Sequence, residues 1–73
     1  MKFSPLDTVV LVHDIPQHGL RAGDVGAVVD VYENGTLEVE FVRPNGDTQA
    51  LVTLTASDVR SVIKTDVLSV RAP

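Results

Sequence analysis

The chain contains no cysteine among its 73 residues. Disulfide bridges and thiolate metal sites are therefore excluded. A domain of this size buries only about 60% of the surface that its unfolded chain exposes. Packing of apolar side chains, or association with a partner, must supply the stability that cross-links give to other very small domains. The lack of cysteine fits a reducing compartment, and we expect a cytoplasmic protein.

Long hydrophobic runs and aromatic residues are also scarce. The longest apolar run, residues 9–12, is far shorter than the ~20 residues that span a bilayer. The first residues lack the apolar core of a signal peptide, so we expect neither a membrane span nor export. Phe3, Tyr32 and Phe41 are the only aromatic residues, which leaves little material for the stacking platforms of many nucleic-acid and peptide readers.

Basic residues are the minority among the charges. Ten acidic residues against six basic ones give a net charge of −4 and a pI near 4.8. This average field repels phosphate backbones and anionic lipid headgroups. The charges are dispersed along the chain, as on an ordinary solvated surface. Nucleic acid and membrane are therefore disfavoured as partners, and a protein with a basic surface is favoured.

Short β-branched runs separated by turn residues predict five strands. Residues 14–24 are predicted as a long loop, and the small residues of 55–59 predict a single 3₁₀ turn. No segment has helical periodicity. The predicted strands cover residues 8–13, 25–32, 36–42, 48–54 and 60–63.

Alternation of apolar and polar residues assigns the faces of two strands. In 36–42, Glu38 and Glu40 share the wet face, and the opposite residues Leu37, Val39 and Phe41 share the buried one. In 25–32, Asp30 and Tyr32 are predicted to face outward. The residues of that strand predicted to face the core are Ala27, Val29 and Val31.

Two turn sequences predict hairpins. Asn34-Gly35 between alternating segments predicts a type I′ turn, in which both central residues take a positive φ. The segment 43–47 combines Pro44, which fixes φ, with Gly46, where φ must be positive. The chain should therefore form a three-stranded meander from residue 25 to residue 54.

These elements predict an all-β fold, a small five-stranded SH3-like barrel with a 3₁₀ turn before the last strand, over residues 1–63. An OB-fold is the alternative, but it usually needs a helix between its third and fourth strands and a longer chain. The remaining residues, 64–73, contain Val67, Leu68 and Val70. We expect this tail to add an edge strand or to contact a second copy of the chain in a homodimer.

Several segments together resemble a family of small bacterial domains of unknown function, family 4926. The segments that carry the resemblance are 6–11, 14–16, 23–29, 38–41 and 52–54. It covers residues 6–62 and implies an SH3-like fold, but it implies no activity.

A dozen residues are also similar to the KOW motif of ribosomal and transcription-elongation proteins, whose members often bind RNA. The motif positions are Gly19, Leu20, Gly23, Gly26 and Val28. The segment departs from the motif because it lacks a basic loop: Arg21 stands against Asp24 and Asp30.

Three groups of residues carry chemistry that could support catalysis or metal binding. His13, Asp14 and His18 are of the types that bind zinc or transfer protons, but two histidines with turn-forming carboxylates are better explained as solvated loop residues. Ser57-Asp58 is explained by turn chemistry. Glu38 and Glu40, about 7 Å apart along a strand, resemble a glycosidase pair in spacing only. We predict no catalytic residue, no metal site and no cofactor.

The loop that contains Gly19, Gly23 and Gly26 has the glycine content of a phosphate-binding loop. In phosphate-binding loops the glycines lead into a helix, whereas here a strand follows. Bending of the chain explains its glycines better. In SH3-like barrels the loop that corresponds to 14–24 commonly meets the partner, and loops on a rigid scaffold concentrate function. The alternative is a mobile loop whose Leu20 side chain is tucked into the mouth of the barrel.

The leading hypothesis is a non-enzymatic protein-binding module, acting as a small adaptor, an accessory subunit or an antitoxin-like partner. An acidic surface would meet a basic partner and the loop would supply specificity. The predicted binding residues are Ile15, Leu20, Arg21, Asp30, Tyr32, Glu33, Glu38 and Glu40. The alternatives are RNA binding through Arg21, Arg43 and Arg60, and a non-catalytic subunit of a metalloenzyme, which rests on analogy of fold.

Overall fold

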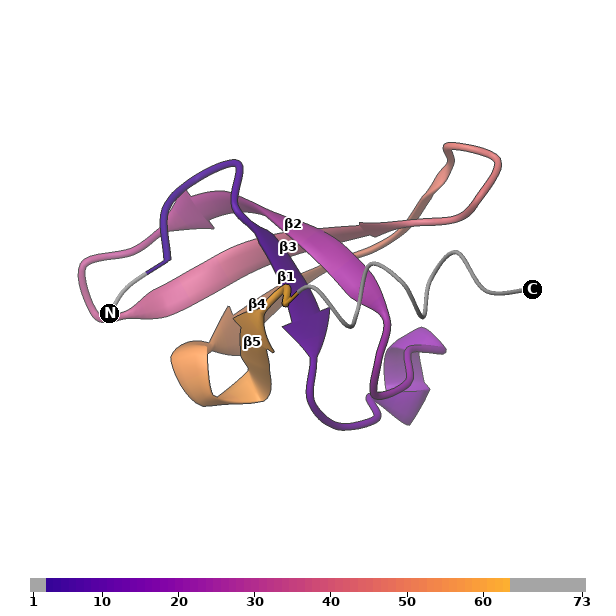
Figure 1. The fold of residues 1–73 in the computed structure, drawn as a ribbon, viewed down its shortest axis with the longest axis horizontal. Coiled ribbons are helices and arrows are strands. Elements are labelled where there is room, and N and C mark those ends of the chain that lie inside the picture. Colours follow the sequence, from indigo (N-terminus) through magenta and orange to yellow (C-terminus); the bar gives the residue numbers. More distant parts are fainter. Residues whose placement is uncertain (1–2, 64–73) are drawn as a thin grey trace.

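The computed structural model describes residues 3–63, and they form one antiparallel sheet with the strand order β4-β3-β2-β1-β5 (Figure 1). The strands are β1 (Thr8–Leu11), β2 (Val25–Val31), β3 (Thr36–Val42), β4 (Thr48–Thr55) and β5 (Val59–Ser61). Two 3₁₀ turns, η1 (Pro16–His18) and η2 (Ala56–Asp58), lie between them. The predicted all-β fold, its five strands and the 3₁₀ turn before the last strand are confirmed.

The ends of the sheet show how far the barrel closes. The first strand pairs with both β2 and β5, whereas β4 pairs with β3 alone and no ladder joins β4 to β5 within residues 3–63. Within the described part of the chain the sheet therefore has two edge strands, β4 and β5. The SH3-like description stays a prediction, and the predicted role of the tail falls outside the described residues.

Four of the five strands differ from the sequence prediction at one end or both, β2 and β4 by a single residue, and one element was not predicted. The first strand ends at Leu11 instead of residue 13, and the last one covers 59–61 instead of 60–63. The predicted loop 14–24 contains η1, which begins at Pro16 and is capped after His18 by Gly19 with a left-handed φ of 68°. Proline is well suited to the first helical position because its missing N–H would be unpaired there in any case.

A single cluster of aliphatic residues and one phenylalanine forms the core. On β3 the predicted inward residues Leu37, Val39 and Phe41 are at most 2% exposed, and Glu38 and Glu40 lie on the opposite face. The other members of the cluster are Val9, Leu11, Ile15, Leu20, Val28, Val52, Leu54 and Val59.

The assignment of faces on β2 was wrong at two positions. Val28 is fully buried, whereas Ala27 is exposed and Val29 is 44% exposed. A register shift between Val28 and Asp30 marks a β-bulge, which inserts one residue and reverses the alternation. Beyond the bulge Val31 packs against the core as predicted.

Both hairpins have the same turn, and it is not type I′. Gly35 N donates to Tyr32 O (2.9 Å), and Gly46 N donates to Arg43 O (2.8 Å). Gly35 and Gly46 have φ values of 91° and 93°, and Asn34 does not have a positive φ. This is a type I turn followed by a left-handed glycine, which needs only one residue with positive φ.

Candidate functional site

The loop between β1 and β2 was predicted to present Ile15 and Leu20 to a partner, and the structure places both in the core. Leu20 is 1% exposed and Ile15 is 7% exposed. Their backbones form an isolated bridge in which Ile15 N donates to Leu20 O (2.9 Å). Both side chains therefore serve the core, and only a small part of Ile15 reaches the surface. Of the predicted loop residues only Arg21 is exposed.

Hydrogen bonds tie the same loop to the sheet at several points. Asp14 Oδ1 accepts from Ala22 N (2.8 Å), and Gln49 Nε2 donates to Gly19 O (3.0 Å). Gly23 N donates to Leu11 O (2.8 Å) with a φ of 97°. Carboxylates that accept from backbone amides stabilise turns, so the loop is built as part of the fold.

The third glycine of this region, Gly26, has a packing role. A Cβ atom at this position would lie 2.8 Å from side-chain atoms of both Phe41 and Val39. Both neighbours are buried in the core and have no free space to move into. The structural explanation of the glycines therefore holds for positive φ at Gly19 and Gly23 and for close approach at Gly26.

A histidine–carboxylate pair joins the end of β1 to η2, and the sequence interpretation missed it. His13 Nε2 lies 2.7 Å from Asp58 Oδ1. The bond to Asp58 raises the pKa of His13, and the same bond lowers the pKa of Asp58, helped by a hydrogen bond from Thr55 N. The two residues are 45 positions apart, so no local sequence signal could have paired them. His13 has a carboxylate partner and is not simply solvated.

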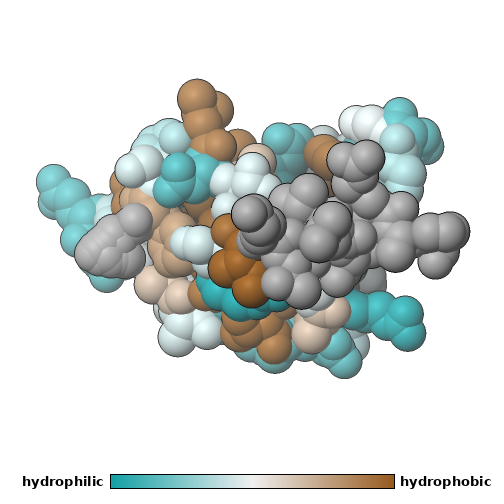
Figure 2. All heavy atoms as spheres, in the orientation of Figure 1, coloured by the Kyte–Doolittle hydropathy of each residue, from teal (hydrophilic) through white to brown (hydrophobic). Residues whose placement is uncertain are grey.

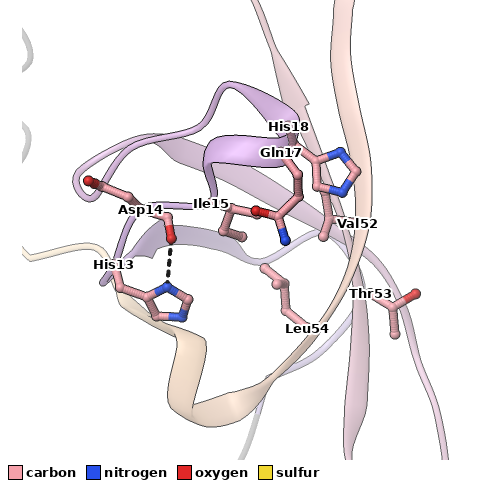
Figure 3. Close-up of a pocket in the computed structure, with 8 residues that line it drawn as sticks. All are labelled: His13, Asp14, Ile15, Gln17, His18, Val52, Thr53 and Leu54. Carbon is pink, nitrogen blue, oxygen red and sulfur yellow. Dashed lines mark hydrogen bonds between the residues drawn. The ribbon is translucent and has the colours of Figure 1, made fainter.

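His13 of this pair borders a shallow depression of about 340 Å³ beside β4 (Figure 3). Ile15 and Leu54 point toward one another at its floor, and the Gln17 amide reaches over it. Thr53 belongs to the rim but its side chain points to the other side of β4. The lining residues are His13, Asp14, Ile15, Gln17, His18, Val52, Thr53 and Leu54. An apolar floor with a polar rim suits an apolar side chain better than an ion.

The depression does not assemble the metal or nucleophile sites considered from the sequence. Among residues 3–63, no three histidine, aspartate or glutamate side chains converge on a common point. Ser57 Oγ lies 2.9 Å from Thr55 Oγ1 and forms no hydrogen bond to a described histidine. Asp58 is occupied by His13 and by the Thr55 backbone.

The outer face of β2, β3 and β4 brings three of the predicted acidic residues together. The register places Asp30, Glu38 and Thr53 in one row across the three strands. A second row contains Ala27, Glu40 and Leu51. Within the described part of the chain, no lysine or arginine forms an ion pair with these carboxylates. We call this surface, defined by Asp30, Glu38, Glu40, Leu51 and Thr53, the acidic face.

Hydroxyl groups of β4 hold the two glutamates of the acidic face. Thr53 Oγ1 donates to Glu38 Oε1 (2.8 Å), and Thr48 Oγ1 donates to Glu40 Oε2 (2.8 Å). Both carboxylates therefore reach toward β4, and Glu38 Oε1 also accepts from the Tyr32 hydroxyl (3.4 Å). The charge of Glu38 raises the pKa of Tyr32, with a smaller effect from burial and from Asp30. The field at this face is therefore negative.

Apolar side chains accompany these charges. Leu51 on β4 is 55% exposed, and beyond β3 two further apolar residues, Val29 on β2 and Tyr32 directly after it, are 44% and 43% exposed. The coloured part of the surface in Figure 2 likewise shows hydrophobic residues in separate patches between polar ones. Glu33, the remaining predicted acidic residue, lies in the β2–β3 turn, and no described side-chain contact joins it to Glu38 or Glu40.

The arginines of the RNA hypothesis are dispersed. Arg21 belongs to the β1–β2 loop and Arg60 to the edge strand β5. Arg43 belongs to the β3–β4 turn, which extends away from the rest of the ribbon (Figure 1). It lines a second, wider hollow of about 640 Å³ together with Asp24.

No helix within residues 3–63 is long and apolar enough to cross a membrane. No curated protein and no solved structure shows a match to the chain. Residues 6–61 match a family described as a domain of unknown function, over the segments on which the sequence resemblance rests. The chain therefore belongs to the family Domain of unknown function (DUF4926).

Proposed function

We propose that the protein is a non-enzymatic binding module whose acidic face binds a basic surface of another protein. The observation that carries this proposal is the row of Asp30 and Glu38 beside Glu40 on one sheet face, with no described cation to neutralise them. Complementary charge steers association and selects the partner. The exposed Leu51 supplies apolar area at the same place.

The arrangement of the carboxylates supports binding more than catalysis. Glu38 accepts from the hydroxyls of Thr53 and Tyr32, and Glu40 accepts from the hydroxyl of Thr48. Catalytic carboxylates usually need environments that separate their pKa values, whereas these two share one strand face and the same kind of hydroxyl partner. Their fixed orientation reduces the side-chain entropy that a basic partner must remove. A module of this kind fits the role of an adaptor or accessory subunit.

The double variant Glu38→Gln/Glu40→Gln tests the proposal. Protein retained from an extract of the producing cells by the wild type is identified and quantified by mass spectrometry at low and moderate salt. We expect a protein with a basic surface that the wild type retains and the double variant loses, with weaker retention as salt screens the charges.

The matched control is Glu33→Gln/Asp47→Asn, which removes the same two charges from the two hairpin turns. We expect the control to retain the same protein as the wild type. Equal loss by both double variants would show that net charge drives retention, and an unchanged retained set with Glu38→Gln/Glu40→Gln would refute the acidic face as the binding surface.

A further inference from the structure

We infer that the free edge of β4 binds an extended segment of the partner as an added antiparallel strand, with basic side chains over the acidic face and an apolar side chain in the depression. The inference rests on the proposed function and specifies how the partner is bound. Strand addition is a common mode of peptide recognition, in which backbone bonds give affinity and alternate side chains give specificity.

The first observation is the composition of the edge. β4 has eight residues, Thr48–Thr55 with the sequence TQALVTLT, and it carries no charge and no proline. Edge strands of monomeric proteins are usually protected by lysine, by proline or by shortness. β4 has none of these protections along the stretch from Ala50 to Thr55, where its ladder with β3 is regular.

The hydrogen-bond phase shows which backbone groups are free. Tyr32 N donates to Thr36 O across the β2–β3 hairpin (2.9 Å), so the even-numbered residues of β3 direct their backbone groups to β2. The odd-numbered residues, including Val39, direct theirs to β4. Val39 is opposite Val52, so Val52 bonds to β3.

The neighbours of Val52 therefore direct their backbone groups to the open side. Leu51 and Thr53 each present an N–H and a C=O there, and within residues 3–63 nothing pairs with them. Thr55, two residues further in the same phase, confirms the direction, because its N–H donates to Asp58 Oδ2 (2.8 Å) and not to β3.

An antiparallel strand at this edge fixes where its side chains lie. The residues that bond to Leu51 and Thr53 lie in the rows of Glu40 and Glu38, on the acidic face. They are alternate residues of the added strand, about 7 Å apart. The added strand lies one strand spacing, roughly 5 Å, beyond β4, and both carboxylates already reach hydroxyl groups of β4. Lysine or arginine at these two positions can reach the carboxylates.

The residue between the two basic ones faces the other side. It lies opposite Val52, and its side chain enters the depression floored by Ile15 and Leu54. A valine-sized side chain suits the volume of about 340 Å³ and its apolar floor. A second copy of the chain fits this edge less well, because its own β4 is uncharged at the matching positions and its Glu38 and Glu40 would add negative charge.

The experiment is an NMR titration with the acetylated, amidated peptide Thr-Val-Lys-Val-Lys-Val-Thr. We expect the largest amide shifts at Leu51 and Thr53. The first control is the isomer Thr-Val-Lys-Lys-Val-Val-Thr, which has the same charge but cannot place both lysines on one face. The second control methylates the backbone nitrogens of the two lysines, and its matched partner methylates those of the flanking valines instead.

We expect the isomer and the lysine-methylated peptide to bind about tenfold or more weakly than the parent peptide, because the isomer loses a charge contact and the methylated peptide loses two backbone hydrogen bonds. The valine-methylated peptide should bind nearly as well as the parent. In the protein, Leu51→Pro removes an outward N–H but no bond to β3, so it should weaken binding while its spectrum stays that of a folded domain.

Equal binding of all four peptides, or no binding of the parent peptide, would refute strand addition. If Glu38→Gln/Glu40→Gln weakens binding of the parent peptide while lysine methylation has no effect, the result supports the proposed function but refutes the addition of a strand. If only methylation matters, the edge binds a strand but the acidic face does not select it. A dimer in sedimentation that Leu51→Pro abolishes would assign the edge to a second copy and overturn the inference.

Discussion

The β1–β2 loop and the acidic face of the sheet differ in where their side chains lie: key apolar side chains of the loop are buried in the core, whereas those of the acidic face are exposed to solvent. The sequence of the loop has features that are typical of binding loops. It has irregular structure, glycines, histidine and apolar residues that lie outside any predicted strand. It is nevertheless anchored, since Ile15 and Leu20 belong to the core. The acidic face belongs to regular strands, yet it keeps charges and Leu51 in solvent.

This comparison shows that regularity of structure is a poor guide to availability. The β1–β2 loop helps to cover the core of a small domain, and its Ile15 and Leu20 side chains are needed there. A strand has two faces, and the core requires only one. The outer face of a strand is therefore free to serve a partner, and the following predictions test this division.

The largest effect is expected at Leu20. Leu20→Ala should lower the free energy of unfolding by about 2–5 kcal/mol, the usual cost of truncating a buried leucine. Urea denaturation measures it. Arg21→Ala, the exposed neighbour, is the matched control and should stay within about 0.5 kcal/mol of the wild type. If Leu20→Ala lowered the free energy of unfolding as little as the control does, Leu20 would not be needed for the core and the loop could serve as a binding surface.

A smaller effect is expected at Gly26. Gly26→Ala should cost about 1–3 kcal/mol, because its methyl group would collide with the buried Phe41 and Val39 side chains. In the double variant Gly26→Ala/Val39→Ala the space lost at one residue is returned at the other, so the two costs should be less than additive. Strict additivity would show that the backbone, not packing, requires glycine there.

The sequence predicts the fold well wherever one local rule decides the outcome. The alternation of Glu38 and Glu40 with apolar residues fixed both faces of β3, and the polar segment before β5 gave the 3₁₀ turn. Asn34-Gly35 placed the hairpin correctly. Its turn type was wrong because type I with a following glycine needs only one positive φ, a difference that the dipeptide does not encode.

The errors arise where residues distant in the sequence decide the outcome. The bulge beyond Val28 reversed the predicted faces of Ala27 and Val29, and bulges depend on how two strands fit together. The contact between His13 and Asp58 joins residues 45 positions apart. Likewise the candidate site was only partly predictable. Alternation identified its carboxylates, but their alignment with the free edge of β4 follows from register.

The smallest predicted effect separates a residue kept for the fold from one kept for a partner. Asp30 and Glu38 are directly opposite on neighbouring strands, and like charges in that position destabilise a sheet by about 0.2–1 kcal/mol. Glu38→Gln should therefore raise the free energy of unfolding slightly at low salt, since glutamine can still accept the hydroxyl bond from Thr53. Glu40→Gln is the matched control, because Glu40 lies opposite the uncharged Ala27 and has no such repulsion to lose. If Glu38→Gln is more stable than the wild type but no longer binds the partner, the charge of Glu38 lowers the free energy of unfolding and is needed for binding. Lower stability would instead mean that its charge is needed by the sheet itself.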